Sequence, residues 1–327
     1  MKRRQALFGI LGLAGGLPAA SELAAQATAK VPIIGMLDAG SDRVEWWAAF
    51  RQQLRDLGYV ERRNIAFELR LAGGKFERLP ASAQELVRIP ATVIVTSGTV
   101  AARIGKQATS GIPIVMATGD DPVRLGIAAS LARPGGNVTG MTSVASGLAG
   151  KRFELLREIQ PKLARLAVLL NEQSPVATNF RQGLEAAARP LKIPLQFVEL
   201  RSSEDFAAAF SAMARERASA IFVINDPRFF AERRRIADLA IKYRLPSVVG
   251  AGEYVDAGAL ISYAPSYPDL FRRTAFYVDR ILKGAKPGDL PIEQPTKFEL
   301  VINMKTARAL GVKIPPAVLL RAERVIE

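Results

Sequence analysis

The sequence contains neither cysteine nor histidine in its 327 residues. The absence of cysteine excludes disulfides, thiol nucleophiles and cysteine-ligated zinc sites. The absence of histidine excludes Ser-His-Asp triads and every acid/base scheme that depends on imidazole. Because no other catalytic or metal-ligating pattern takes their place, we expect no enzyme, no cofactor and no bound metal.

The composition otherwise fits a folded, strongly basic protein. Hydrophobic residues make up 49% of the chain, the formal net charge is +14, and the length fits about two domains. Nucleic-acid binding is one interpretation of the charge. However, the basic residues lie along amphipathic helical patterns such as ERRRIADLAIKYR (232–244), without interleaved aromatics. We therefore expect solvated helix faces and no nucleic-acid partner.

The first 29 residues have the three regions of an export signal. Lys2, Arg3 and Arg4 precede an apolar run that ends near residue 17, and small residues follow up to cleavage points after Ala27 or Ala29. The apolar run is shorter than the roughly 20 residues that a membrane span needs. We expect residues 1–29 to be a removed signal peptide, which takes the charge from +14 to +12 because three cations and one anion are lost. The paired arginines leave the general and the twin-arginine export routes both open.

After the leader, short apolar strands alternate with amphipathic helical patterns. The expected strands of a first set are 31–37, 64–70, 92–96 and 113–117, and those of a second set are 164–171, 194–200, 219–225, 246–250 and 258–263. Between them, segments such as 44–58 show apolar residues at intervals of three and four. This alternation predicts an α/β fold with parallel sheets that are covered on both faces.

The two sets of strands repeat a local pattern. Asp120 lies seven residues after Pro113 in the first set, and Glu253 lies seven residues after Pro246 in the second, each directly after a glycine. Both prolines also follow a strand, a polar loop and a helical segment. The repetition predicts two related α/β lobes that arose by duplication.

Polar residues follow most of the expected strands. Ligands of open parallel sheets bind beyond the carboxyl ends of the strands, so two facing lobes would form a cleft for a small molecule there. The candidate ligand-binding residues are Asp38, Ser41, Ser97, Gly98, Thr99, Thr118, Asp120, Asp121, Asn171, Asn225, Asp226 and Glu253. Backbone donors of 97–99 would hold a carboxylate and the acidic side chains an ammonium group. The alternative for each residue is helix capping, which favours the same residue types.

Three stretches carry a resemblance to a known family. They are PIVMATGDDPVRLGIAASLARPGGNVTGMTS (113–143), LGYVERRNIAFELR (57–70) and ILKGAKPGDLPIEQPTKFELVINMKTARALGVKIPPAVLLRAERVIE (281–327). In combination they resemble the ABC transporter substrate-binding proteins, the family that includes the tryptophan- and tyrosine-binding components of uptake systems. The resemblance covers essentially all of residues 31–327.

This resemblance implies a type I periplasmic-binding-protein fold of two Rossmann-like lobes with an interdomain cleft and a three-crossover hinge. It implies a first lobe of 31–141 plus 264–291 and a second lobe of 142–263 plus 292–327, with crossovers near 139–143, 262–264 and 291–294. The implied partners are a small-molecule ligand and the permease subunits of an inner-membrane ABC transporter. We expect a monomer in the periplasm, with the signal peptide removed.

The resulting hypothesis is a periplasmic receptor that closes by hinge motion around an amino acid or a related carboxylate. Two alternatives stay open at this point. One is an exported sensory receptor with the same lobes. The other is an exported hydrolase that uses Asp120 and Asp121 as acid and base, although adjacent residues usually point apart.

Overall fold

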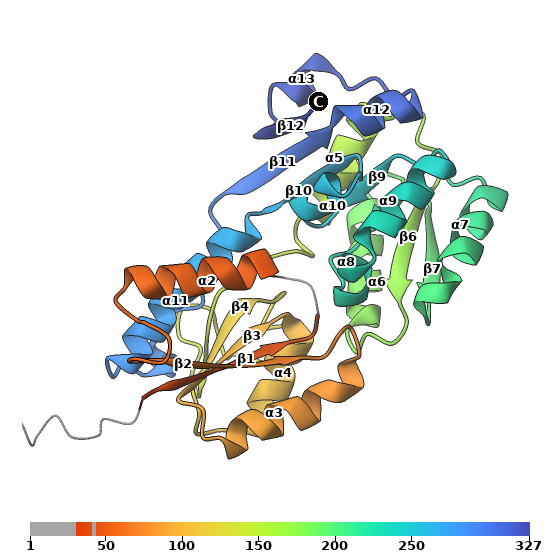
Figure 1. Ribbon diagram of the computed structural model, residues 1–327. Coiled ribbons are helices and arrows are strands. Elements are labelled where there is room, and N and C mark those ends of the chain that lie inside the picture. Colours follow the sequence, from red (N-terminus) through yellow and green to blue (C-terminus); the bar gives the residue numbers. More distant parts are fainter. Residues whose placement is uncertain (1–30, 41–43) are drawn as a thin grey trace, which may run out of the picture. The chain divides into compact units, whose positions relative to one another are not determined.

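The computed structural model describes residues 31–40 and 44–327 (Figure 1). The expected signal peptide and the predicted site residue Ser41 lie outside the described residues. In the described part of the chain, no helix is both long and apolar enough to cross a membrane.

The first sheet is parallel and has the strand order β2-β1-β3-β4-β5. Its strands are β1 (Ile33–Asp38), β2 (Ala66–Leu71), β3 (Val93–Ser97), β4 (Ile114–Thr118) and β5 (Val138–Gly140). Every residue of β3 and β4 is buried, as expected for strands that are covered on both faces. The expected strands of the first set are thus found within two residues at each end.

Helices cover both faces of the first sheet (Figure 1). One face packs against α2 (Val44–Asp56) and α11 (Tyr267–Leu282), which lie along each other, and the other packs against α3 (Leu79–Arg88) and α4 (Thr99–Ala108). Alternate residues of β3 follow this division, because Val93 and Val95 join the core under α2 while Ile94 joins the core over α3 and α4.

The second sheet has the strand order β12-β11-β10-β9-β8-β6-β7, and it is parallel except for the antiparallel pair β10–β11. Its strands are β6 (Leu166–Asn171), β7 (Leu195–Leu200), β8 (Ala220–Val223), β9 (Ser247–Val249), β10 (Ile261–Pro265), β11 (Phe298–Asn303) and β12 (Arg324–Ile326). Its helices are α5 (Ala149–Ile159), α6 (Ala177–Ala188), α7 (Phe206–Arg215), α8 (Pro227–Ala231), α9 (Arg233–Lys242), α10 (Gly252–Asp256), α12 (Met304–Leu310) and α13 (Pro316–Leu319). Short 3-10 turns lie at Phe76–Arg78, Ser203–Asp205 and Pro287–Asp289.

The two sheets share one topology. The order β2-β1-β3-β4-β5 of the first sheet corresponds to β7-β6-β8-β9-β10 of the second, so each strand of the first has a counterpart in the second. This is the doubly wound arrangement in which the strand order reverses between the first and third strands. The sequence prediction of two Rossmann-like lobes is confirmed, and each lobe is named below by its sheet.

The chain passes between the sheets at three places. It leaves the first sheet after β5, returns between β10 and α11, and enters the second sheet again before β11. Two of these crossovers pair with each other, because Thr142 donates its amide hydrogen to Glu293 O (2.9 Å) and Glu293 donates its own to Gly140 O (2.9 Å). The exact lobe limits implied by the resemblance stay a prediction.

Candidate functional site

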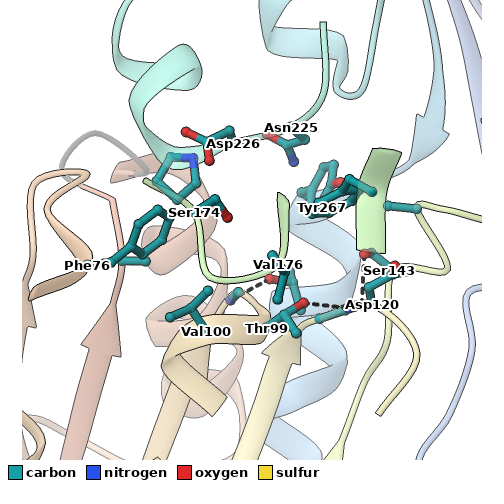
Figure 2. Close-up of a pocket in the computed structure, with 17 residues that line it drawn as sticks. Phe76, Thr99, Val100, Asp120, Ser143, Ser174, Val176, Asn225, Asp226 and Tyr267 are labelled. Atoms are coloured by element: carbon teal, nitrogen blue, oxygen red, sulfur yellow. Dashed lines mark hydrogen bonds between the residues drawn. The ribbon is translucent and has the colours of Figure 1, made fainter. Parts of the chain in front are cut away.

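A cavity lies where the carboxyl ends of the strands of both sheets meet (Figure 2). The volume of this cavity that is open to the centres of water molecules is about 70 Å³, several times what a single water molecule needs. Its lining residues are Ala39, Phe76, Gly98, Thr99, Val100, Thr118, Gly119, Asp120, Ser143, Ala145, Ser174, Val176, Phe180, Asn225, Asp226, Pro227 and Tyr267. They come from both lobes, so a molecule in this cavity would contact both.

The N-terminus of α4 borders the cavity. Gly98 joins β3 to α4 with φ +92°, a conformation that favours glycine, and its amide donates to Thr118 Oγ1 (3.0 Å). Thr99 Oγ1 accepts from the amide of Asp120 (2.8 Å), which ties the ends of β3 and β4 together. In the described structure no side chain caps α4, and its first turn holds no acidic residue. Its first amides therefore have no intrahelical acceptor and present partial positive charge at the cavity.

The N-terminus of α6 borders the same cavity from the second lobe. Val176 occupies the N-cap position without a side-chain cap, and the first turn again holds no acidic residue. Ser174 and Val176 line the cavity, and Ser174 O accepts from the amide of Ala177 (2.9 Å). Two uncapped helix N-termini, one from each lobe, thus make this part of the cavity favourable for an anion.

Asp120 is the acidic group that the first lobe brings to the cavity. Its side chain is almost fully buried, and its Oδ1 accepts from the amide (3.2 Å) and the hydroxyl (2.9 Å) of Ser146. Arg124 lies 3.8 Å from Oδ2, too far for a short ion pair. The carboxylate is therefore held in place by Ser146, and its cationic neighbours are Arg124 at long range and the buried Arg152, which interacts with it electrostatically.

Asp226 is the acidic group that the second lobe brings. It is 4% exposed, and Oδ1 accepts from the amide of Arg228 (2.9 Å) at the start of α8. The side-chain nitrogen Nδ2 of Asn171 donates to both carboxylate oxygens at 3.2 Å. Burial raises the pKa of Asp226, and these hydrogen bonds only partly oppose that shift. A cation in the cavity would stabilise the charged form.

The remaining walls are mostly neutral. Phe76, Val100, Val176, Phe180 and Tyr267 supply apolar surface, and no lysine or arginine is among the described lining residues. The side-chain oxygen of Asn225 is buried and has no hydrogen-bond partner within the described part of the chain. The cavity thus combines two carboxylates and a spare acceptor with two helix N-termini and an apolar wall.

The structure brings together part of the predicted site. The predicted residues that line the cavity are Gly98, Thr99, Thr118, Asp120, Asn225 and Asp226. Ser97 and Asn171 lie buried directly behind it, and Asn171 acts through its hydrogen bonds to Asp226.

Three other predicted residues have structural partners elsewhere. Asp38 accepts from the indole nitrogen of Trp47 (2.8 Å), and Glu253 accepts from that of Trp46 (2.5 Å). Asp121 is exposed and accepts from the amides of the two residues that follow Pro122, as a turn-capping residue does.

Sequence reasoning missed the aromatic walls Phe76 and Tyr267. Tyr267 comes two residues after the end of β10. The rule that ligands bind beyond the ends of strands could therefore have indicated this residue too. Phe76 begins the short 3-10 turn after β2, where no periodic pattern in the sequence marks the direction of its side chain.

Among the described residues, no group of three or more acidic side chains is placed to hold a metal ion.

Two doubly wound α/β lobes joined by three crossovers, with a cavity lined from both, define a solute-binding protein of the periplasmic-binding type. The family model for "ABC transporter substrate binding protein" matches residues 21–326, and the chain belongs to this family. The resemblance found in the sequence is thereby confirmed.

Relatives of known description agree with the family. The chain is 25% identical over 264 residues to a tyrosine-binding protein of Clostridioides difficile, covering 81% of this chain and 76% of the relative. An ABC domain from Streptococcus pneumoniae, solved in complex with L-Trp, superposes with a TM-score of 0.84 at 25% identity, covering 91% of this chain and all of that one. A conserved domain protein from Vibrio cholerae superposes with a TM-score of 0.84 at 29% identity, covering 90% and 100%. The type I periplasmic-binding fold and the binding of a small ligand follow.

Proposed function

We propose that this chain is the exported binding component of an ABC uptake transporter and that it binds a zwitterionic amino acid in the cavity between the lobes. The observation that carries the proposal is the charge pattern of that cavity. Asp120 and Asp226 face a cavity whose described lining has no lysine or arginine, while two uncapped helix N-termini border it. An ammonium group matches the first feature and a carboxylate matches the second.

The apolar wall receives the side chain of the amino acid. Phe76, Val100, Phe180 and Tyr267 offer a surface suited to an aliphatic or aromatic group. The relatives support this class of ligand, because one was solved with L-Trp and another is described as tyrosine-binding.

Ligand binding would drive closure of the lobes by a population shift. A molecule that contacts both lobes has higher affinity for the closed form and therefore increases its population. The closed form would then dock on the permease subunits of the transporter. We propose that the protein acts as a monomer in the periplasm after its signal peptide is removed, which N-terminal sequencing of the exported protein would test.

No observation favours the alternative hydrolase. Asp120 lines the cavity, whereas Asp121 is exposed and caps a turn, so the two carboxylates do not face one reacting position. The proposed role is binding without turnover.

Thermal melting with matched compounds tests the ligand class. L-Tyrosine and L-tryptophan are each compared with the amine that lacks the carboxylate and with the acid that lacks the ammonium group. At 100 times its dissociation constant, a ligand adds about 2.7 kcal/mol of stability. We expect a shift with an intact amino acid and a much smaller one with either truncated compound. Equal shifts for the acid alone would contradict the role of the aspartates.

A pair of neighbouring variants supplies the control. Asp120→Asn removes a charge from the cavity and should abolish most of the thermal shift, because a buried charge partner of the ammonium is lost. Asp121→Asn removes a charge one residue further on, where asparagine still caps the turn. It should leave the shift unchanged.

A further inference from the structure

Trp46 is a residue of the first lobe that is fully buried against the second. Helix α2 packs on the first sheet, where the ring of Phe50 lies 6.3 Å from that of Phe67. The neighbouring Trp47 donates its indole hydrogen to Asp38 at the end of β1 (2.8 Å). Both contacts lie within the first lobe, so α2 is anchored there.

Trp46 forms a stacked pair with Tyr267. The ring centroids are 4.4 Å apart and the planes are inclined by 11°. Because Tyr267 begins α11, which packs along α2, the first lobe presents this pair as one surface. Stacking of this kind favours a fixed orientation of both rings.

The other contacts of Trp46 reach the second lobe. Its indole nitrogen donates to Glu253 Oε1 of α10 at 2.5 Å, and its ring lies 5.0 Å from that of Phe230 in α8. A separation of the lobes that moves α2 away from α8 and α10 would break these two contacts and expose the apolar ring to water. Closure would thus bury an aromatic side chain and supply a donor to a half-buried carboxylate.

Two residues that contact Trp46 also connect it to the cavity. Tyr267, which stacks on Trp46, lines the cavity on its other side. Phe230 lies in α8, whose N-cap residue Asp226 also lines the cavity (Figure 2). A change in how the indole packs therefore affects one apolar wall and one carboxylate of the site.

We propose that Trp46 is a positioning residue that holds the two lobes closed through Glu253 and Phe230 and fixes the cavity wall through Tyr267. The occupant of the cavity rests on the proposed function, whereas the contact between lobes does not.

The absence of cysteine makes disulfide trapping a direct test of closure. A Cβ atom added to Gly74 of the first lobe would lie 3.5 Å from the Cβ of Arg228 in the second. This separation lies at the short end of the range for a disulfide, and the cysteine at position 74 would take a strained φ of +77° that is the same in every variant compared. In the pair Gly74→Cys/Arg228→Cys, oxidation by diamide in ligand-free buffer should proceed at a rate proportional to the closed population.

The two tryptophans form a matched comparison in this background. Trp46→Phe removes the hydrogen bond to Glu253 and should slow trapping about tenfold, since a hydrogen bond to a charged group is lost only in the closed form. Trp47→Phe removes an equivalent indole-to-carboxylate bond inside the first lobe and should change the rate less than about twofold. Equal slowing by both variants, or none by Trp46→Phe, would overturn the proposal.

Glu253 variants test the same contact if Trp46→Phe does not fold. Glu253→Ala removes the acceptor and should slow trapping, whereas Glu253→Gln keeps an acceptor oxygen and should restore most of the rate. Similar slow rates for both would show that the charge, not the indole bond, controls closure, and would overturn the role of Trp46. Thermal melting of the same variants with L-tyrosine reports ligand binding separately, so the proposed function can fail while the contact holds.

Discussion

Asp226→Asn should stabilise the protein and weaken its ligand binding at the same time. Asp226 is buried at the cavity, and burial raises the pKa of its carboxyl group above the ordinary 3.8. The change to asparagine is nearly isosteric, and it keeps one of the two oxygens that accept from Asn171. It also keeps the cap of α8, because asparagine accepts the amide hydrogen of Arg228 as well as aspartate does.

The sign of the stability change follows from the raised pKa. An acid whose folded-state pKa is raised contributes stability that is present below its unfolded-state pKa and lost as the pH rises through the folded-state value. At pH 7 the charged carboxylate therefore destabilises the ligand-free fold. We expect Asp226→Asn to gain on the order of 1 kcal/mol at pH 7, as is common when a functional residue is replaced. Below pH 3.8 the gain should disappear.

Ligand affinity should change in the opposite direction. Loss of a buried charge that pairs with the ammonium group costs about 2 kcal/mol or more, which is roughly 30-fold in the dissociation constant. Calorimetric titration with L-tyrosine or L-tryptophan measures this affinity, and urea unfolding at pH 3 and pH 7 measures the stability.

A surface aspartate supplies the control. Asp205 has a lowered pKa because the amide of Ser202 donates to it, so Asp205→Asn should reduce stability near neutral pH and leave ligand binding unchanged. A loss of stability in Asp226→Asn at pH 7 would show that the charged carboxylate does not destabilise the ligand-free fold. An unaltered affinity would show that Asp226 does not pair with the ammonium group of the ligand. Either result would refute the reasoning.

Two further changes test the packing around the crossovers. Gly140→Ala should destabilise the fold by about 3 kcal/mol or more, because its φ is +119° and a Cβ would lie 2.3 Å from Met116 O. Gly126→Ala is the control, since Gly126 also has a positive φ but open space around it, and it should cost about 1 kcal/mol. The midpoints of urea unfolding measure both values. Arg152→Met should cost about 2 kcal/mol in the same assay, because two partly buried carbonyl groups lose their donors. The exposed Arg157→Met on the same helix should stay within about 0.5 kcal/mol.

The regular part of the fold could be predicted because its signals are local. Buried strands such as 92–96 and 113–117 are short apolar runs, and the parallel sheet follows from their alternation with helical patterns. The rule that ligands bind at the carboxyl ends of strands then indicated residues such as Thr118, Asp120 and Asp226. These residues line the cavity because strand ends within one sheet must meet at one edge.

The direction of individual side chains could not be predicted in the same way. Asp120 and Glu253 occupy matching positions in the two repeats, yet Asp120 lines the cavity and Glu253 accepts from Trp46, which is 207 residues away in sequence. A contact between lobes depends on their packing as whole bodies, and no local periodicity encodes it. The internal repeat therefore indicated equivalent backbone positions but not equivalent roles.

The duplicated topology explains why one ligand would close the protein. The first lobe presents the N-terminus of α4 and the carboxylate of Asp120, and the second presents the N-terminus of α6 and the carboxylate of Asp226. Each lobe alone thus offers one partner for a carboxylate and one for an ammonium group. When the lobes meet, each charged group of an amino acid gains a second partner from the opposite lobe. This difference in affinity between the open and closed forms is what a population shift requires, and it arises here from two copies of one supersecondary pattern that face each other.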